Sequence, residues 1–161
     1  MKKIAIYPGT FDPITNGHLD LVVRATQIFD EIIIAVSDNP RKNPLFDIHQ
    51  RLDMIKQVTT NIPNVVAERF DDLLVAYVQE KKAKFVIRGL RAVSDFDFEF
   101  QMAAANRRMD ENIETIFLTP SEDNYFISSS LVREISHYAG DVSSFVAPVV
   151  LEALEQKRIG S

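Results

Sequence analysis

The sequence predicts an α/β fold, a Rossmann-like, doubly wound, parallel sheet of five strands with helices on both faces. Short strand-like segments alternate with longer segments of helical periodicity, which is typical of parallel strands joined by crossover helices. No long linker, repeat or low-complexity tract interrupts this alternation. The 161 residues are 46% hydrophobic and 25% charged, so we expect residues 1–161 to form a single domain around one core.

Strands are expected where short apolar runs occur, and helices where apolar residues recur every three or four positions. The first helix is the clearest case, and its apolar residues are Leu19, Leu21, Val22, Ala25, Ile28 and Phe29. The expected strands are residues 3–7, 32–37, 65–70, 85–88 and 115–118. The expected helices are near residues 17–29, 47–60, 72–82, 95–109 and 129–138.

The segment 95–100 alternates acidic and aromatic residues, which by itself is typical of an amphipathic strand. Its continuation through residues 101–105 favours a helix instead. In that helix Phe96 and Phe100 share one face, and Phe98 lies partly elsewhere, where it is available to pack against another subunit.

A C-terminal helical segment is expected at about residues 141–158. Residues 141–144 are predicted to cap it, and Pro148 is predicted to break or restart it. The apolar side chains of this segment indicate packing and not chemistry.

Composition argues against several classes of protein. A net charge of −5 and a pI near 5.2 disfavour a nucleic-acid-binding surface. The longest apolar run, Ile32 to Val36, is too short to cross a bilayer, and the N-terminus lacks the apolar core of a signal peptide, so we expect a cytoplasmic protein without membrane contact. There is no cysteine, and the three histidines show no metal-ligand spacing. Any metal is therefore expected to arrive mainly with the substrate.

The strongest functional signal is YPGTFDPITNGH, Tyr7–His18, named here the first motif. It joins a strand to a helix, and ligands bind at such turns in open α/β sheets. Gly17 and His18 lie at the helix N-terminus, where unpaired N–H groups and the helix dipole favour phosphate. A helix-opening Gly-His pair alone is more often structural. The helix end lowers the pKa of His18 and bound phosphate raises it, which leaves its charge state open.

A second motif, FISSSLVR at Phe126–Arg133, opens another helix. Its hydroxyls can cap that helix or, with backbone N–H groups, hold a polyphosphate, and Arg133 lies one turn after Ser129. Taken alone, the segment is more simply a serine-rich cap with a solvated arginine. With only five glycines the chain has neither a GxGxxG nor a GxxxxGKS/T loop, so nucleotide phosphates would need helix N-termini and isolated cations.

TxGH in the first motif and ISSSxxR in the second resemble the paired signature of the nucleotidyltransferase α/β-phosphodiesterase superfamily. Together with IRGLRAVSDFDFEFQMAAANRRM, residues 87–109, they closely resemble the bacterial phosphopantetheine adenylyltransferase family over essentially the whole chain. The resemblance implies adenylyl transfer from ATP to 4'-phosphopantetheine in coenzyme A biosynthesis. It also implies Mg²⁺ bound mainly through the ATP phosphates, coenzyme A as a feedback ligand, and a homohexamer.

The same resemblance implies the site residues. It implies catalytic roles for three residues: His18 donates a hydrogen bond to the α-phosphate, and Thr10 and Lys42 position the phosphates. The residues implied for 4'-phosphopantetheine are Thr10, Lys42, Leu74 and Arg88. The residues implied for ATP are Thr10, Phe11, His18, Gly89, Leu90, Arg91, Glu99, Asn124, Tyr125, Phe126, Ile127, Ser128, Ser129 and Ser130.

Without the resemblance, several of these residues have plainer interpretations. Lys42 would belong to a solvated polar turn, Leu74 to the core, and Glu99 to a solvated helix face. Arg88 ends the fourth strand, where it can pair with a surface acid or bind phosphate with two hydrogen bonds.

Two other functions stay open. TxGH and ISSSxxR alone also fit a nucleotidyltransferase of the same superfamily that uses nicotinamide mononucleotide or glycerol 3-phosphate, although IRGLRAVSDF favours pantetheine. The second is a regulatory module that binds ATP without chemistry. Release of pyrophosphate distinguishes them, because a module that only binds ATP makes none.

Overall fold

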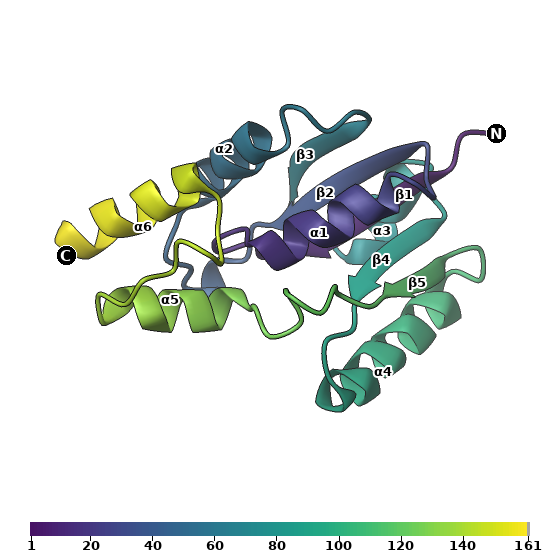
Figure 1. The fold of residues 1–161 in the computed structure, drawn as a ribbon. Helices are drawn as coiled ribbons and strands as arrows, with labels where there is room; N and C mark the ends of the chain where they lie inside the picture. Colours follow the sequence, from purple (N-terminus) through teal and green to yellow (C-terminus); the bar gives the residue numbers. More distant parts are fainter. Residues whose placement is uncertain (161) are drawn as a thin grey trace.

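The computed structural model describes residues 1–160 and contains the predicted parallel sheet (Figure 1). The strands are β1 (Ile4–Gly9), β2 (Glu31–Ser37), β3 (Val65–Phe70), β4 (Phe85–Gly89) and β5 (Glu114–Leu118). Their order is β3-β2-β1-β4-β5, and every neighbouring pair is parallel. The predicted α/β class, the number of strands and their direction are confirmed.

Helices cover both faces of this sheet, as predicted. They are α1 (Asn16–Ala25), α2 (Ile48–Val58), α3 (Leu74–Glu80), α4 (Val93–Met109), α5 (Ser129–His137) and α6 (Pro148–Ile159). Apolar side chains of α1, α2, α5 and α6 pack in one core cluster, and those of α3 pack in the other. The sheet therefore lies between two apolar layers.

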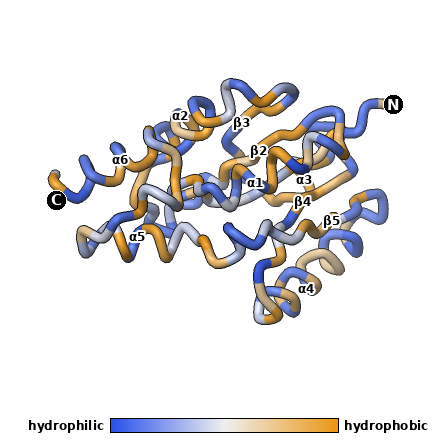
Figure 2. The backbone as a smooth tube through the Cα atoms, in the orientation of Figure 1, coloured by the Kyte–Doolittle hydropathy of each residue, from blue (hydrophilic) through white to orange (hydrophobic). Residues whose placement is uncertain are grey.

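Alternate residues of the central strands point to these two layers. In β2, Ile32 and Ile34 belong to the cluster that contains α1, whereas Ile33 belongs to the cluster that contains α3. Because both faces of the strand are covered, its sequence is a continuous apolar run and not an alternation of apolar and polar residues. Figure 2 shows hydrophobic residues along β2 and β4 in the middle of the molecule.

The expected helix 17–29 is too long at its C-terminal end. α1 ends at Ala25, and Ile28 and Phe29 both donate their N–H groups to the Ala25 carbonyl oxygen in the turn that follows. Phe29 lies outside α1 but is still buried. Its apolar side chain therefore reflects its burial and not a helical position. All five expected strands, and the other four helices expected up to residue 138, agree with the structure within two residues at each end.

The C-terminal helical segment expected at about 141–158 is wrong at its start. The helix α6 begins at Pro148, which confirms the prediction that Pro148 breaks or restarts the segment, because proline lacks an N–H group and its ring is tolerated only in the first turn of a helix. The residues before it form a loop in which Val142 and Val146 are buried. Val150 and Leu154 of α6 are also buried, which agrees with the expected packing role.

The long helix α4 lies beside β5 at the edge of the sheet (Figure 1). The segment 95–100 is helical, and Phe96 and Phe100 share a face, with ring centroids 5.2 Å apart. The buried residues of this helix are the polar Glu99 and Asn106, whereas Phe98 is 61% exposed. α4 therefore turns polar side chains inward and leaves aromatic ones outside.

The topology creates a ligand-binding edge between β1 and β4. From β1 the chain crosses to β2 and β3 on one side, and from β3 it returns to β4 on the other side. Ligands of open α/β sheets bind at such a reversal, beyond the carboxyl ends of the strands. The first motif continues from β1 and reaches this edge. No helix among residues 1–160 is long and apolar enough to span a membrane.

Candidate active site

A cavity of about 510 Å³ opens at this edge. Its walls come from the first motif, the Lys42 region, the end of β4, α4 and the second motif. The predicted site residues that line it are Thr10, Phe11, His18, Lys42, Arg88, Gly89, Arg91, Glu99, Asn124, Ile127, Ser128, Ser129 and Ser130. Segments that lie far apart in the sequence therefore form one site.

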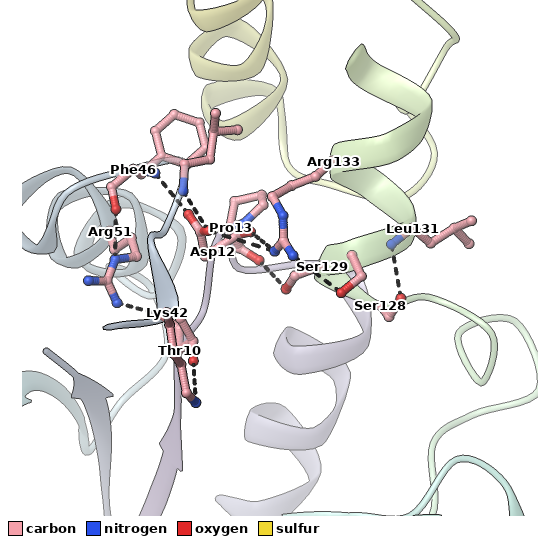
Figure 3. Close-up of polar contacts among 12 residues, drawn as sticks. Thr10, Asp12, Pro13, Lys42, Phe46, Arg51, Ser128, Ser129, Leu131 and Arg133 are labelled. Atoms are coloured by element: carbon pink, nitrogen blue, oxygen red, sulfur yellow. Dashed lines mark hydrogen bonds and ion pairs between the residues drawn. The ribbon is translucent and has the colours of Figure 1, made fainter. Parts of the chain in front are cut away.

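The two motifs are hydrogen-bonded directly to each other (Figure 3). The Ser129 hydroxyl donates to the Pro13 carbonyl oxygen at 2.8 Å. Arg133 donates from Nη1 to the Asp12 carbonyl oxygen at 2.6 Å. These contacts fix the start of α5 against the turn that follows β1.

The serines of the second motif have different partners. Ser128 caps α5, because its hydroxyl accepts the Leu131 N–H at 3.1 Å. The Ser130 hydroxyl accepts a hydrogen bond from Nη2 of Arg133 at 3.3 Å. The plain interpretation as a helix cap therefore holds for Ser128, but Arg133 is not simply solvated, since it lies in the cavity wall.

His18 takes part in the cap of α1. Its Nδ1 accepts the Thr15 N–H at 3.0 Å, and its own N–H donates to the Thr15 hydroxyl oxygen at 3.4 Å. An amide N–H can only donate, so Nδ1 carries no proton and the neutral ring carries its proton on Nε2. Because His18 lines the cavity, Nε2 is the ring nitrogen available to a ligand there.

The surroundings of His18 keep the ring neutral. Burial, followed by the positive charges of Arg91 and Arg88, lowers the pKa of His18 to about 4. The charge state that the sequence leaves open is therefore neutral at pH 7. A neutral ring still donates one hydrogen bond from Nε2, so it can bind a phosphate oxygen without carrying charge.

Phe11 packs against the His18 ring, with 4.9 Å between the ring centroids, and edge-on against Tyr7 at 5.2 Å. The φ of Phe11 is 51°, in the left-handed region that residues other than glycine seldom adopt. Gly9 leaves room for the ring, since a Cβ at this position would lie 2.9 Å from Cε2 of Phe11. The turn after β1 therefore positions an aromatic wall beside the histidine.

Lys42 reaches the cavity from a short 3-10 helix, Pro40–Lys42, where the sequence predicts only a polar loop. The Asn39 side chain caps this turn by accepting the Arg41 N–H at 3.1 Å. Nζ of Lys42 donates to the Thr10 hydroxyl oxygen at 3.2 Å. The two residues expected to position phosphates are thus in contact.

Arg88 is paired with the Glu99 carboxylate. Its guanidinium donates two hydrogen bonds to the Glu99 carboxylate, at 2.8 and 2.7 Å, and one to the Pro8 carbonyl oxygen at 3.0 Å. Burial opposes the charge of Arg88, but Glu99 outweighs burial and raises the pKa of Arg88. Glu99 is only 8% exposed, so its interpretation as a solvated helix charge is wrong.

Arg91 links the end of β4 to the second motif. Its Nη1 donates to the Ile127 carbonyl oxygen at 3.2 Å. The Asp95 carboxylate accepts the Arg91 N–H at 3.2 Å and lies 3.8 Å from Nε of the same residue. This pairing holds Arg91 at the cavity edge beside Ile127.

Leu74 lines an adjoining cavity of about 260 Å³ and not the first one. Phe70, Phe98 and Met102 supply apolar walls to this second cavity. The residues that line both cavities are Pro8, Gly9, Lys42, Arg88 and Glu99. A single ligand can therefore extend from one cavity into the other past the Arg88–Glu99 pair.

Three predicted ATP residues line neither cavity: Leu90, Tyr125 and Phe126. Tyr125 and Phe126 are exposed, and the Phe126 ring packs edge-on against Phe145, with centroids 5.6 Å apart. Their backbone nevertheless continues directly into Ile127 and the capping serines. These residues therefore lie beside the first cavity and not in its wall.

Sequence reasoning missed Asp12, Asp95 and Arg133 as cavity residues. The signal for Arg133 was present, because it is the arginine that ends ISSSxxR. Asp12 also lies within the first motif, but nothing local shows that its side chain is buried. Asp95 sits among alternating acids of α4, where the sequence offers no reason to choose one over another.

The cavity is suited to a polyanion. Lys42, Arg88, Arg91 and Arg133 reach it from three different segments, namely the Lys42 region, the end of β4 and α5. Guanidinium groups bind phosphate with geometrically specific pairs of hydrogen bonds, and a lysine adds a mobile point charge. No group of three or more histidine or carboxylate side chains within residues 1–160 could hold a metal ion.

An open parallel sheet with a cationic cavity at its topological switch point defines a nucleotide-binding class of α/β protein. A family model described as cytidylyltransferase-like matches residues 6–135, and the chain belongs to this family. A phosphopantetheine adenylyltransferase from Hahella chejuensis is 52% identical over 94% of this chain and 94% of its own length. Another, from Thermodesulfovibrio yellowstonii, is 53% identical over 98% of both. Within the family, the chain therefore belongs with the phosphopantetheine adenylyltransferases.

Solved structures agree with the fold. A candidate nicotinate-nucleotide adenylyltransferase from Vibrio parahaemolyticus has a TM-score of 0.74 at 22% identity, covering 98% of this chain and 96% of that one. A bifunctional NMN adenylyltransferase/ADP ribose pyrophosphatase from Francisella tularensis, complexed with AMP and a manganese ion, has a TM-score of 0.66 at 17% identity. The match covers 97% of this chain and 49% of that one. At these identities the likeness shows the fold alone.

Proposed function

We propose that this protein transfers the adenylyl group of ATP to 4'-phosphopantetheine, the step of coenzyme A biosynthesis that gives dephospho-coenzyme A. The observation that carries the proposal is more than 50% identity to curated phosphopantetheine adenylyltransferases along nearly the whole chain. The cavity supports it, because a neutral histidine donor and several cations meet at the ligand-binding edge of the sheet.

In the proposed reaction an oxygen of the 4'-phosphate attacks the α-phosphorus of ATP. A new P–O bond forms there, the bond from the α-phosphorus to the oxygen that bridges to the β-phosphate breaks, and pyrophosphate leaves with the electron pair. The reaction is reversible and needs no covalent intermediate with the enzyme. Positioning and stabilisation of charge on the nonbridging oxygens account for most of the acceleration of such transfers.

His18 is the proposed donor to the α-phosphate in the transition state. Its Nδ1 is occupied by the Thr15 N–H, which directs the only ring proton of the neutral form to Nε2. Thr10 and Lys42, already in contact, are proposed to position the reacting phosphates together.

The acceptor phosphate is proposed to bind Arg88 beside Lys42. Because Glu99 now occupies the Arg88 guanidinium, the phosphate would compete with this carboxylate for the same donors. The pantetheine arm is proposed to extend past Arg88 into the adjoining cavity with Leu74. The floor of that cavity includes Thr115, whose buried hydroxyl has no hydrogen-bond partner within residues 1–160 and is suited to an amide of the arm.

ATP is proposed to occupy the side of the first cavity formed by the second motif. Arg91 and the hydroxyl and N–H groups at the start of α5 are suited to its phosphates. The remaining residues proposed for ATP are Thr10, Phe11, Gly89, Leu90, Glu99, Asn124, Tyr125, Phe126, Ile127, Ser128, Ser129 and Ser130.

Mg²⁺ is proposed to enter with ATP, held mainly through the triphosphate. Within residues 1–160 no group of three or more histidine or carboxylate side chains could hold a metal ion, so the phosphates would supply most of its ligands. The bound ion would neutralise part of the triphosphate charge. The Francisella tularensis protein, half of which matches this fold, was solved with AMP and a manganese ion, so a divalent ion accompanies a nucleotide in that protein.

We further propose a cytoplasmic homohexamer with coenzyme A as a feedback ligand. The aromatic side chains that α4 exposes support self-association of the chain. The number of subunits and the feedback ligand rest on the family resemblance. The cytoplasm is proposed because ATP, the adenylyl donor, is available there.

The test is pyrophosphate release by purified protein given ATP, Mg²⁺ and one acceptor at a time. Release with 4'-phosphopantetheine, and not with nicotinamide mononucleotide or glycerol 3-phosphate, is the expected result. Release with another acceptor would retain the chemistry and overturn the substrate. No release with any of them would favour a module that binds ATP without chemistry.

The same assay tests His18. His18→Ala should lower kcat by about 10²- to 10³-fold with a modest change in KM, the usual cost of one transition-state donor. The matched control is His49→Ala, because His49 is exposed at the start of α2 and lies outside both cavities. Equal kcat for the two variants would remove His18 from the mechanism.

A further inference from the structure

Asp12 has a buried carboxylate that no step of the proposed reaction uses. It is 3% exposed, and its two oxygens accept the N–H groups of Leu45 and Phe46 at 2.8 and 2.9 Å (Figure 3). These N–H groups belong to the chain just after Lys42. Arg133 lies 3.7 Å from the same carboxylate, which partly compensates its charge.

Arg51, in α2, is a buried cation with an unusual set of partners. It is 2% exposed, and its guanidinium donates to the carbonyl oxygens of Phe46 at 3.0 Å, Thr10 at 2.9 Å and Ser37 at 2.9 Å. Within residues 1–160 it forms no ion pair. Burying a guanidinium costs free energy unless its hydrogen bonds are well formed. The three bonds of Arg51 therefore hold the segments of Thr10, Ser37 and Phe46 together at one point.

Together the two side chains hold both ends of the segment 38–46, named here the Lys42 loop. Arg51 binds the carbonyl oxygen of Ser37 just before the loop and that of Phe46 at its end, and Asp12 binds the Phe46 N–H. The peptide groups on both sides of Phe46 are therefore held: the Asp12 carboxylate accepts the N–H of one, and the Arg51 guanidinium donates to the carbonyl oxygen of the other. Lys42 itself is exposed and lies between these fixed ends.

The same side chains also belong to, or bind, the first motif. Asp12 lies within that motif, and Arg51 binds the carbonyl oxygen of Thr10, whose hydroxyl contacts Nζ of Lys42. The distance between the Lys42 loop and the turn after β1 is thus set by two buried contacts and not by the long lysine side chain. A lysine ammonium is a point charge on a flexible stem, so its placement depends on its backbone.

We propose that Asp12 and Arg51 are positioning residues that hold the Lys42 loop against the first motif and so place the Lys42 ammonium at the reacting phosphates. This inference rests on the proposed adenylyl transfer. Neither side chain needs to touch a substrate. Their removal is expected to act on catalysis mainly through Lys42, with smaller effects through Arg133 and Thr10, which they also contact. Dependence on Lys42 therefore separates positioning from a general loss of structure.

The test is a double-mutant cycle in the pyrophosphate assay, with Asp12→Ala, Lys42→Met and the double variant. In the wild-type background Asp12→Ala should lower kcat/KM about 100-fold, the cost of misplacing a reacting group by about 1 Å. In the Lys42→Met background the same change should cost less than about 3-fold, because the ammonium that Asp12 positions is gone.

Conservative variants extend the test. Asp12→Asn keeps one oxygen that can accept one of the two N–H groups, so its loss should lie between wild type and Asp12→Ala. Arg51→Lys keeps the charge but cannot reproduce the planar fork that reaches three carbonyl oxygens, so it should show the same dependence on Lys42. If Asp12→Ala does not fold, Asp12→Asn and Arg51→Lys replace it in the double-mutant cycle.

The matched control is Asp47→Ala. The Asp47 carboxylate accepts the Gln50 N–H at 2.8 Å as the cap of α2, next to Phe46, but it does not hold the Lys42 loop. Its kcat/KM should stay within about 2-fold of the parent in both backgrounds, as expected for an exposed site outside the cavity.

The inference is overturned if each Asp12 and Arg51 variant loses the same factor in kcat/KM in the wild-type and Lys42→Met backgrounds. A merely structural role would lower kcat/KM equally in both. Failure of the inference is distinguishable from failure of the proposed function. An active wild type with independent losses contradicts the positioning role alone, whereas a wild type that releases no pyrophosphate contradicts the adenylyl transfer.

Discussion

The lowered pKa of His18 makes the stability of the protein depend on pH. The ring has an ordinary pKa of 6.5 when unfolded and a pKa of about 4 when folded, mainly because burial disfavours the cation. The folded protein therefore resists protonation of this residue. The contribution of His18 to the free energy of unfolding is fully present above pH 6.5 and is lost as the pH falls from 6.5 toward about 4.

The magnitude follows from the difference between the two pKa values. By linkage the His18 contribution falls by about 2 kcal/mol between pH 8 and pH 5, and by about 3 kcal/mol at the acid limit. The ring lines a cavity that water can enter, so about 2 kcal/mol is an upper estimate of the change between pH 8 and pH 5. With a urea m-value of about 2 kcal/mol/M, 2 kcal/mol shifts the midpoint of unfolding by about 1 M.

The assay is urea unfolding of the wild type and of His18→Asn at pH 8 and pH 5. Asparagine cannot take up a proton in this range, and its side-chain oxygen can accept the Thr15 N–H as Nδ1 does. Other groups titrate alike in both proteins, so the difference between them isolates His18. On going to pH 5, the wild type should lose about 1 M more of its urea midpoint than the variant does.

The refuting result is a parallel loss of stability in the two proteins. It would show that His18 keeps an ordinary pKa in the folded state, so that the ring is half charged near pH 6.5. The cation would then compete with the neutral Nε2 donor near and below pH 6.5, and burial in the site would not be what keeps the ring neutral.

Two further predictions concern the walls of the cavity. Gly9→Ala should lower the free energy of unfolding by about 1–3 kcal/mol, because the added Cβ would lie 2.9 Å from the buried Phe11 ring. In Gly17→Ala the nearest atoms are 3.4 Å away, so urea unfolding should show no loss, and an equal loss would contradict the steric reason. Glu99→Gln should cost about 1–2 kcal/mol, because Arg88 loses a charged partner while partly buried. An unchanged urea midpoint would mean that this pair contributes no net stability.

Local pattern was sufficient for most of the fold. The apolar run of β2 and the helical spacing in α1 reflect periodicity within a few residues, which is why these elements agree with the structure almost everywhere. The two errors have the same cause. Phe29 and Val146 are apolar because they are buried, and burial continues past the point where a helix ends or before it begins.

The chemistry of the site was only partly visible in the sequence. The motifs and the family resemblance indicated His18, Lys42 and the serines of the second motif. Pattern alone would have left Glu99 on a solvated face, and it gave no sign that Asp12 is buried. Whether a charged side chain is solvated depends on what packs over it, and a local pattern does not contain that information.

By itself, the sequence determined the order of strands and helices and the class of fold, because periodicity and capping residues act over short distances along the chain. Its motifs also indicated a ligand that carries phosphate, which the proposed function retains. Only the tertiary structure determined which groups meet. Ser129 binds Pro13 across 116 residues, and Arg88 binds the Glu99 carboxylate rather than remaining an unpaired cation. These contacts depend on strand order and on the side to which each crossover returns, and the neutral state of His18 follows from the burial and positive charge that they create.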